Sequence, residues 1–421
     1  MSYRGLAALC CLVLTPLFGQ LKPKDVREIG KDGAPALPKL REILKDPDPR
    51  NRAEAARVIG EIGTAQSIDL LLEALRDNHP DVQIRATDAL VNFYLPGYIQ
   101  SGLAGRLKSV GRAIPWRSPS ENDQVVEPYV QVRPEVIEEL GKIARGGSSM
   151  ASRANAARAV GILRGRAAIA DLLEAMKSKD SNVIYESLIA IQKIQDRSTA
   201  PRIRYLLNDF DERVQIAAVE ATGLLRAEES AGDLVQLFGR TSKPRVRKAA
   251  LLALARIPDP NSRALFQRHL DDRDEDLRGA AAEGLGRLRH AEDREAVERA
   301  FQNETKPSPR LSMAFALVLL GRQEIAEFSP LQTLINTLNN RARQGEAFAL
   351  LVELARDAEI RKLLYPAMAA GTKDEKIYLA RVLGRSGGPD SIPPLERLTD
   401  DRDADVAQEA LRASRSVKSR L

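Results

Sequence analysis

Cysteine and aromatic residues are scarce in this chain. Of its 421 residues only Cys10 and Cys11 are cysteines, and aromatic residues make up 4%. Nothing after Cys11 can therefore form a disulfide or a thiolate metal site. An aromatic content of 4% is low for a β-sandwich or a barrel, whose strands favour such residues, and ordinary for helices rich in Ala and Leu. Apolar residues at 43% are nevertheless enough to build a core.

The sequence also lacks the compact motifs that mark several enzyme classes. It contains no P-loop, no dinucleotide-binding glycine fingerprint and no HExxH. Its three histidines, His79, His269 and His290, are far apart along the chain. We therefore predict no catalytic residue, no cofactor and no metal ion, and hence a protein that is not an enzyme. The net charge of +6 is a small excess among 122 charges and only weakly indicates an anionic partner.

Residues 1–20 differ from the rest and predict a signal peptide. A short segment with Arg4 precedes an apolar run from Gly5 to Phe18, and the small residue Gly19 follows. The run is shorter than the ~20 apolar residues of a membrane span. We expect cleavage near Gln20 and an exported protein, periplasmic or extracellular. An uncleaved anchor and a buried first helix are the alternatives to this interpretation.

The remaining chain repeats with a period of about 31 residues. The register follows from a reference column whose steps are 31 to 35 residues, apart from one step of 70, at Asn51, Val82, Ser152, Val183, Val214, Val246, Leu277, Ser312, Arg343, Glu375 and Val406. Four positions after each reference residue, nine of eleven residues are Ala, and the position eight residues on is mostly apolar. These two positions share one face of a helix, so each repeat contains a helix with a buried stripe of small residues.

A second column places a helix cap in each repeat. Three positions before the reference residue, eight of eleven residues are Asp, Asn, Ser or Thr, which accept hydrogen bonds from the first N–H groups of a helix. Another amphipathic segment precedes each cap, for example at 169–176 and 231–238. Glycines nine positions after the reference, such as Gly161 and Gly223, let neighbouring helices approach closely or end the helix. The repeating unit is therefore a pair of helices.

These columns resemble the short HEAT-like repeats of the phycobilisome-lyase type, as in residues 211–225 and 274–286. The resemblance implies an all-α, right-handed α-solenoid of about eleven HEAT-like helix pairs. The family includes lyases, a hydroxylase and many binding scaffolds. Its hydroxylase holds a di-iron centre with several His-Glu pairs, and no His-Glu dipeptide occurs here. We expect a signal peptide at 1–20, repeats 1 and 2 at 21–94, a non-repeat insertion at 95–134 and repeats 3 to 11 at 135–421.

The insertion is one candidate binding surface. It accounts for the step of 70, its prolines at 115 and 119 interrupt any helix there, and residues 124–133 alternate like an extended strand. A long excursion from a repeat array is a place to look for function. Its candidate partner-binding residues are Tyr98, Arg112, Trp116, Arg117 and Tyr129. The alternative is a degenerate repeat whose aromatic residues fill the gap between two units.

A column of cations is the second candidate surface. Ten positions after the reference residue stand Lys193, Arg256, Arg287, Arg322 and Arg385, which could form a basic stripe along the second helices. The alternative is that these cations complement the dipoles at the ends of their helices. Together the two surfaces predict a non-enzymatic scaffold in the cell envelope that holds a protein partner. The alternatives are a lyase-like enzyme or enzyme accessory and an anion or nucleic-acid binder, nucleic acid being disfavoured by export.

Overall fold

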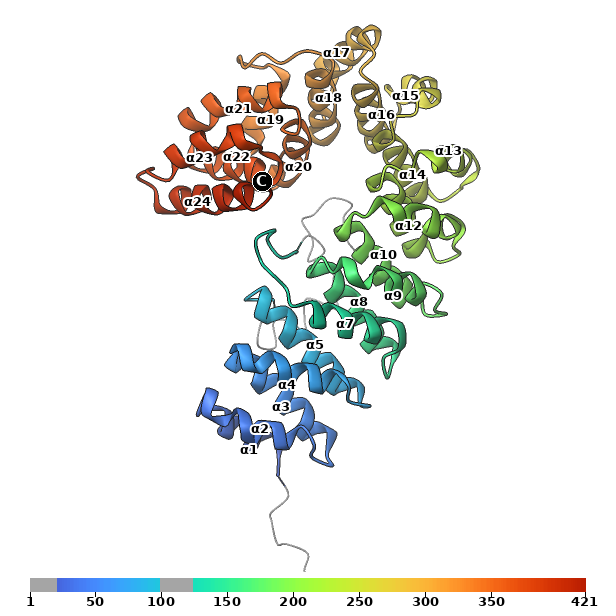
Figure 1. Cartoon of the computed structure of the whole chain (residues 1–421). Coiled ribbons are helices and arrows are strands. Elements are labelled where there is room, and N and C mark those ends of the chain that lie inside the picture. The colour runs from blue at the N-terminus through green and yellow to red at the C-terminus, as the bar shows by residue number, and fades with distance from the viewer. Residues whose placement is uncertain (1–20, 99–123) are drawn as a thin grey trace, which may run out of the picture. The chain divides into compact units, whose positions relative to one another are not determined.

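The computed structural model describes residues 21–98 and 124–421, so the signal peptide expected at 1–20 lies outside the described residues. Within these ranges the ordered structure is helical and contains no strand. The helices follow one another in pairs along the chain, as the repeat register predicts (Figure 1). The all-α solenoid of HEAT-like helix pairs is thereby confirmed.

The second helix of each pair contains the alanine column. These helices are α3 (Pro49–Ile62), α5 (Pro80–Tyr94), α8 (Met150–Ile162), α10 (Ser181–Ile194), α12 (Glu212–Leu224), α14 (Pro244–Arg256), α16 (Glu275–Leu288), α18 (Pro307–Leu319), α20 (Gln344–Leu354), α22 (Lys373–Ser386) and α24 (Ala404–Lys418).

The first helix of each pair is mostly shorter. These helices are α2 (Leu37–Ile43), α4 (Ala65–Leu75), α7 (Pro134–Gly146), α9 (Ile169–Ala175), α11 (Ala200–Ile203), α13 (Ala231–Arg240), α15 (Arg263–His269), α17 (Arg294–Asn303), α19 (Pro330–Thr337), α21 (Ala358–Ala370) and α23 (Ile392–Leu398). An additional helix, α1 (Pro23–Gly30), precedes the first pair and packs on α3. Short 3-10 turns lead into or extend many first helices: η1 (Ala34–Ala36), η3 (Arg166–Ala168), η4 (Arg197–Thr199), η5 (Arg204–Asn208), η6 (Glu228–Ser230), η7 (Pro260–Ser262), η8 (Ala291–Asp293) and η9 (Pro389–Ser391).

The chain divides into two compact units, and the division falls within α5. Unit 1 spans Met1–Ala89 and unit 2 spans Leu90–Leu421. In unit 2 each second helix from α8 onwards packs against the second helix of the next repeat. Helix α5 ends at Tyr94 and α7 begins at Pro134, and the described residues between them form no helix. The expected division into repeats and an insertion at 95–134 stays a prediction.

The alanine column is part of the buried core. Every residue of the alanine column is fully buried, including Ser187 and Leu379, which replace Ala in two repeats. The glycine column lies where neighbouring second helices meet: a Cβ added at Gly223 would lie 2.7 Å from the Cα of Ala253 in the next repeat. At Gly286 the same added atom would lie 2.5 Å from the Cα of Ala316. These distances are below van der Waals contact, so the close approach of neighbouring helices requires Gly.

Seven of the eight predicted caps are confirmed, and the exception is Asn340. Side chains at Asp48, Ser149, Asp180, Asp211, Asp274, Thr372 and Asp403 accept a hydrogen bond from an N–H of the following helix. Helix α18 instead begins at Pro307, so Pro309 lies inside it, and the N-cap of α20 is Arg343 rather than Asn340. The N-cap of α18 lies three residues before the cap column and that of α20 three residues after it, so the long spacing falls between α18 and α20 rather than before Ser312.

Candidate functional site

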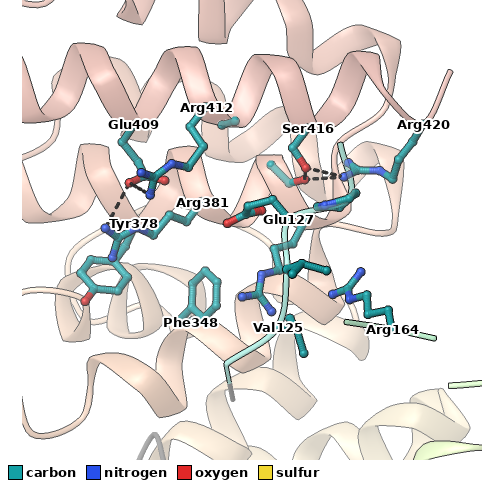
Figure 2. A pocket seen from close by; sticks show the side chains of 15 residues that line it. Val125, Glu127, Arg164, Phe348, Tyr378, Arg381, Glu409, Arg412, Ser416 and Arg420 are labelled. Atoms are coloured by element: carbon teal, nitrogen blue, oxygen red, sulfur yellow. Dashed lines mark hydrogen bonds and ion pairs between the residues drawn. The ribbon is translucent and has the colours of Figure 1, made fainter. Parts of the chain in front are cut away.

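A pocket in unit 2 joins residues that are distant in the sequence. It has a volume of about 350 Å³ and lies between residues 125–128 and the second helices of the last three repeats, α20, α22 and α24 (Figure 2). Five arginines, two glutamates and two aromatic residues dominate its lining: Arg164, Arg381, Arg385, Arg412, Arg420, Glu127, Glu409, Phe348 and Tyr378. We refer to it as the arginine pocket. Its residues thus come from both sides of a large sequence gap.

The segment at 124–133 is held against the repeats at two points. The N–H of Val126 donates to the carbonyl of Ile162 at the end of α8, at 2.9 Å, and the Val126 side chain is buried. The N–H of Arg133 donates to the Tyr94 hydroxyl at 3.3 Å. The alternating pattern of this segment forms no strand, because a single backbone hydrogen bond to a helix end replaces strand pairing. These contacts place Glu127 at the pocket.

Two aromatic rings in edge-to-face contact form the apolar side of the pocket. The rings of Phe348 on α20 and Tyr378 on α22 meet edge to face, with centroids 6.1 Å apart. The guanidinium of Arg381 lies 4.9 Å from the Tyr378 centroid, and that of Arg385 lies 5.7 Å from the Phe348 centroid. Such cation–π contacts hold the cationic groups in place without neutralising them. The rings therefore orient two of the arginines.

Only part of the positive charge in the pocket is neutralised. The nearly buried carboxylate of Glu409 pairs with Arg381 at 3.1 Å and with Arg412 at 3.6 Å (Figure 2). Partial loss of solvation lowers the pKa of Arg420, although the residue as a whole is exposed. Burial also lowers the pKa of Arg164, as does repulsion from Arg385 and Arg420, while the charge of Glu127 acts in the opposite direction. The geometry thus concentrates guanidinium groups that repel one another, which favours binding of an anion.

The structure places one of the ten expected binding residues, Arg385, in the arginine pocket. Arg112, Trp116 and Arg117 lie outside the described residues. Tyr129 is exposed at 39% and does not line the pocket. Tyr98 is partly buried and interacts with Arg158 on α8. A partner-binding role for these residues stays a prediction.

The other four members of the cation column engage residues of the protein itself. Arg287 pairs with Glu283 and Glu353, and Arg322 pairs with Glu298 and Glu324. Lys193 and Arg256 also have interaction partners. Arg256 partly offsets the effect of burial, which raises the pKa of Glu220 on the neighbouring helix α12. The column is therefore largely balanced by carboxylates within the array.

Sequence reasoning missed the other pocket residues, among them Arg164, Arg381, Arg412 and Arg420. Arg164 immediately follows the C-cap of α8, where a left-handed residue is common, so its position looks like ordinary helix termination. Arg420 is the second residue from the end of the chain. Neither position carries a local motif that would mark it as functional.

The side chains of this protein do not fit the di-iron centre of the hydroxylase in the family that the sequence resembles. His79 precedes α5, His269 ends α15 and His290 precedes η8, and no two of them share a helix. The Nδ1 atom of His269 is 2.8 Å from Asp272. Among the described residues, which include all three histidines, no group of His, Cys, Asp or Glu could hold a metal ion. We therefore derive no step through iron.

Comparison with known proteins relates the chain to HEAT-repeat proteins. The description of HEAT repeats matches residues 26–101, 137–222, 172–255, 199–286 and 233–318. A curated relative, deoxyhypusine hydroxylase-B of Oryza sativa subsp. japonica, is 26% identical over 243 residues, which cover 56% of this chain and 75% of the relative.

Two solved structures are similar at low sequence identity. The complex of CpcE and CpcF of phycocyanin lyase from Nostoc sp. is 18% identical, with 79% of this chain and 97% of that chain covered and a TM-score of 0.34. The YibA protein of E. coli is 16% identical, with 72% of this chain and 100% of that chain covered and a TM-score of 0.42.

Within residues 21–98 and 124–421, none of the helices combines the length and the apolar character that a membrane span requires.

The curated relative corrects one expectation from the sequence. We expected a protein that is not an enzyme, but the relative that the chain matches is named for an enzymatic activity. The expectation rested on the absence of compact motifs. That reasoning is insufficient for a repeat array, because a site there can be built from single residues on separate helices.

Proposed function

Because the chain belongs to the HEAT-repeat family, we propose that it is an exported scaffold that holds a segment of a partner protein in the arginine pocket. HEAT-type arrays generally bind other proteins, since stacked helix pairs form extended binding surfaces. The observation that carries the proposal is the assembly of the pocket from residues 125–128 and helices α20, α22 and α24. A site built from such distant parts exists only in the folded array.

The chemistry of the pocket supports a protein partner. Phe348 and Tyr378 offer apolar surface, while arginines surround them with hydrogen-bond donors. Aromatic residues and Arg are the residues most enriched in the energetic centres of protein interfaces. The arginine side chains at 164, 385, 412 and 420 are exposed, so a ligand can reach them.

Export rests on the sequence of residues 1–20. The first described helix, α1, begins at Pro23, directly after the expected cleavage site. The carbonyl of Leu21 accepts a hydrogen bond from Nδ2 of Asn51 at 2.8 Å, so a chain that begins near Gln20 keeps this contact. The mature chain would contain no cysteine, which suits an oxidising compartment.

A paired substitution tests the binding site. The wild-type protein is used to capture partners from the cell envelope of its host, and a captured protein is identified and purified. Its affinity is then measured with the wild type, with Tyr378→Ala in the pocket and with the control Tyr205→Ala, whose ring is 55% exposed on η5 and does not line the pocket.

The proposal expects Tyr378→Ala to weaken binding at least about 10-fold, in the range of an interface hot spot, and the control to change it less than about 2-fold. Circular dichroism establishes that both variants keep the helical fold. If the purified partner binds the Tyr378→Ala variant as tightly as it binds the wild type, the pocket is not the binding site.

A further inference from the structure

Three second helices of unit 2 end in the same way. Each ends with Gly, one further residue, Leu and Arg, so that Arg164, Arg226 and Arg289 occupy the same place in their repeats. Their φ angles are 53°, 52° and 55°, and the N–H of each donates to the carbonyl of the glycine three residues earlier at 3.1 Å. The three side chains therefore leave the array from equivalent backbone positions.

Two of these arginines meet a carboxylate from a distant repeat. Arg226 pairs with Glu353 at the end of α20, at 3.5 Å. Arg289 pairs with Asp357, the N-cap residue of α21, at 3.3 Å. Carboxylates 68 and more residues away along the chain thus satisfy equivalent arginines. This arrangement shows what kind of group the position accepts.

Arg164 has no such partner within residues 21–98 and 124–421. Among the residues that the structure describes, no carboxylate forms an ion pair with its guanidinium, and it lines the arginine pocket beside Arg385 and Arg420 (Figure 2). Arg420 donates to the carbonyl of Gly384 at 2.6 Å and to the Ser416 hydroxyl at 3.0 Å, which are neutral acceptors. The guanidinium of Arg385 lies over the ring of Phe348, which carries no net charge.

The pocket therefore holds Arg164, whose equivalents Arg226 and Arg289 form ion pairs, beside Arg385 and Arg420, for which no ion pair occurs within the described ranges. Glu127 is the one carboxylate nearby that is not already paired, and it forms no ion pair with any of the three within the described ranges. Guanidinium groups bind carboxylates through two parallel hydrogen bonds, which fixes orientation as well as supplying energy. A carboxylate supplied from outside would complete at Arg164 the pattern seen at Arg226 and Arg289.

We propose that Arg164, Arg385 and Arg420 bind side-chain carboxylates of an acidic segment in the partner protein. This inference rests on the proposed function and names the chemistry of its ligand. The carboxylate meets the three arginines, and a neighbouring apolar side chain of the same segment packs against Phe348 and Tyr378. The arginines at the two equivalent positions bind Glu353 and Asp357, which are carboxylates, and this favours a carboxylate over a phosphate as the ligand of Arg164.

A labelled peptide provides the direct probe. It is a fluorescein-labelled, C-terminally amidated 12-residue peptide in which Glu alternates with Leu and Ala, and its control carries Gln in place of every Glu. Binding to the full chain is followed by fluorescence anisotropy at low salt. We expect the Glu peptide to bind at least about 10-fold more tightly than the Gln peptide, because a neutral amide cannot form the charge-assisted hydrogen bonds that a carboxylate forms with guanidinium groups.

The variants are chosen to separate a site from general charge. Arg164→Gln is compatible with the backbone, because Gln195 occupies the next repeat's equivalent position at a φ of 56°. Arg164→Gln and Arg385→Gln should each weaken the Glu peptide about 5- to 10-fold, in line with the loss of a charged hydrogen bond. The control is Arg415→Gln, an exposed arginine on α24 that does not line the pocket and removes the same charge.

Each outcome decides something. Equal weakening by Arg415→Gln would reduce the effect to net charge and overturn the inference. Displacement of the peptide by millimolar inorganic phosphate, but not by acetate at the same ionic strength, would assign the site to phosphate instead. If Tyr378→Ala weakens binding of the purified partner while the Glu and Gln peptides bind equally, the scaffold function stands and the carboxylate ligand is wrong. If Tyr378→Ala leaves the affinity of the partner unchanged, the proposed function itself fails.

Discussion

Arg287 on α16 and Glu353 on α20 join two second helices that are not neighbours in the array. The Nε and Nη2 atoms of Arg287 donate to the two carboxylate oxygens of Glu353, at 2.9 and 2.8 Å. The same guanidinium pairs with Glu283 at 3.1 Å and lies 4.8 Å from the Phe315 ring centroid. Its side chain is only 9% exposed. This ion pair connects the last repeats of unit 2 to the middle ones.

We expect Arg287→Met to destabilise unit 2 by about 3–5 kcal/mol, because it leaves the buried carboxylate of Glu283 without its cation and leaves Glu353 with the longer ion pair to Arg226. Urea unfolding followed by circular dichroism measures the loss, and hydrogen exchange should locate it at α16 and α20. The control is Arg289→Met, whose ion pair with Asp357 is largely exposed and should contribute less than about 1 kcal/mol. Similar losses in the two variants would contradict this account of the pair.

The same contact predicts a pH dependence. Burial acts to raise the pKa of Glu353, but the hydrogen bonds and charge of Arg287 outweigh it, so the pKa lies below its ordinary value. A depressed pKa contributes stability that is fully present above the unfolded value of about 4.3. This contribution is lost as the pH falls through the pKa of the folded state.

The wild type should therefore be more stable than Glu353→Gln at pH 7, and the difference should shrink below about pH 4, where the unfolded carboxyl begins to bind a proton. Urea midpoints of the two proteins at a series of pH values between 7 and 3 provide the measurement. A difference that stays constant or grows towards pH 3 would refute the sign of this linkage.

Replacing a glycine of the glycine column by Ala should cause a steric clash, whereas the same replacement at a glycine outside the column should not. Gly223→Ala would place a Cβ 2.7 Å from the Cα of Ala253, so neighbouring helices must move apart, at a cost of about 1–3 kcal/mol. A Cβ added at Gly232 on α13 would have no atom within 4 Å other than those of its neighbours in the same helix, so Gly232→Ala should be neutral or stabilising by up to about 1 kcal/mol. Thermal unfolding compares the two, and equal melting temperatures for both variants would argue against the close approach of α12 and α14.

Glu127 should compete with an acidic ligand for the arginine pocket. Its charge acts on Arg164, so Glu127→Gln should tighten binding of the Glu peptide about 2- to 5-fold, the size of a solvent-screened pair. Glu295→Gln on α17 changes the net charge equally, but its side chain is 88% exposed and does not line the pocket. Anisotropy titrations of both variants decide the matter. Unchanged affinity in Glu127→Gln would mean that this carboxylate does not compete.

The sequence of residues 1–20 predicts a mature chain that begins near Gln20 or Leu21. Its short charged start, apolar run and small terminal residue are those of a secretory signal. Mass spectrometry of the protein isolated from its host, together with cell fractionation, measures both the terminus and the compartment. Recovery of the intact chain from Met1 in the cytoplasm would exclude both cleavage and export.

The repeat architecture could be predicted from residues alone because its contacts recur at one sequence spacing. Gly223 meets the next second helix at Ala253, and Gly286 meets the one after its own at Ala316, so packing between neighbours appears as columns in the sequence. Caps such as Asp211 are encoded in the same way, since they bond to N–H groups two and three residues later. Periodic local contacts therefore determine the helix pairs and their order.

The arginine pocket depends on contacts that no repeat spacing encodes. Arg164, Arg226 and Arg289 share one motif and one backbone conformation, yet two of them form ion pairs and the third faces other arginines. Arg287 and Arg385 likewise share one column, but the first is buried between carboxylates and the second lines a pocket. The difference arises where residues 125–164 meet residues 348–420, because the accumulated rotation of many repeats, rather than any local pattern, brings those segments together.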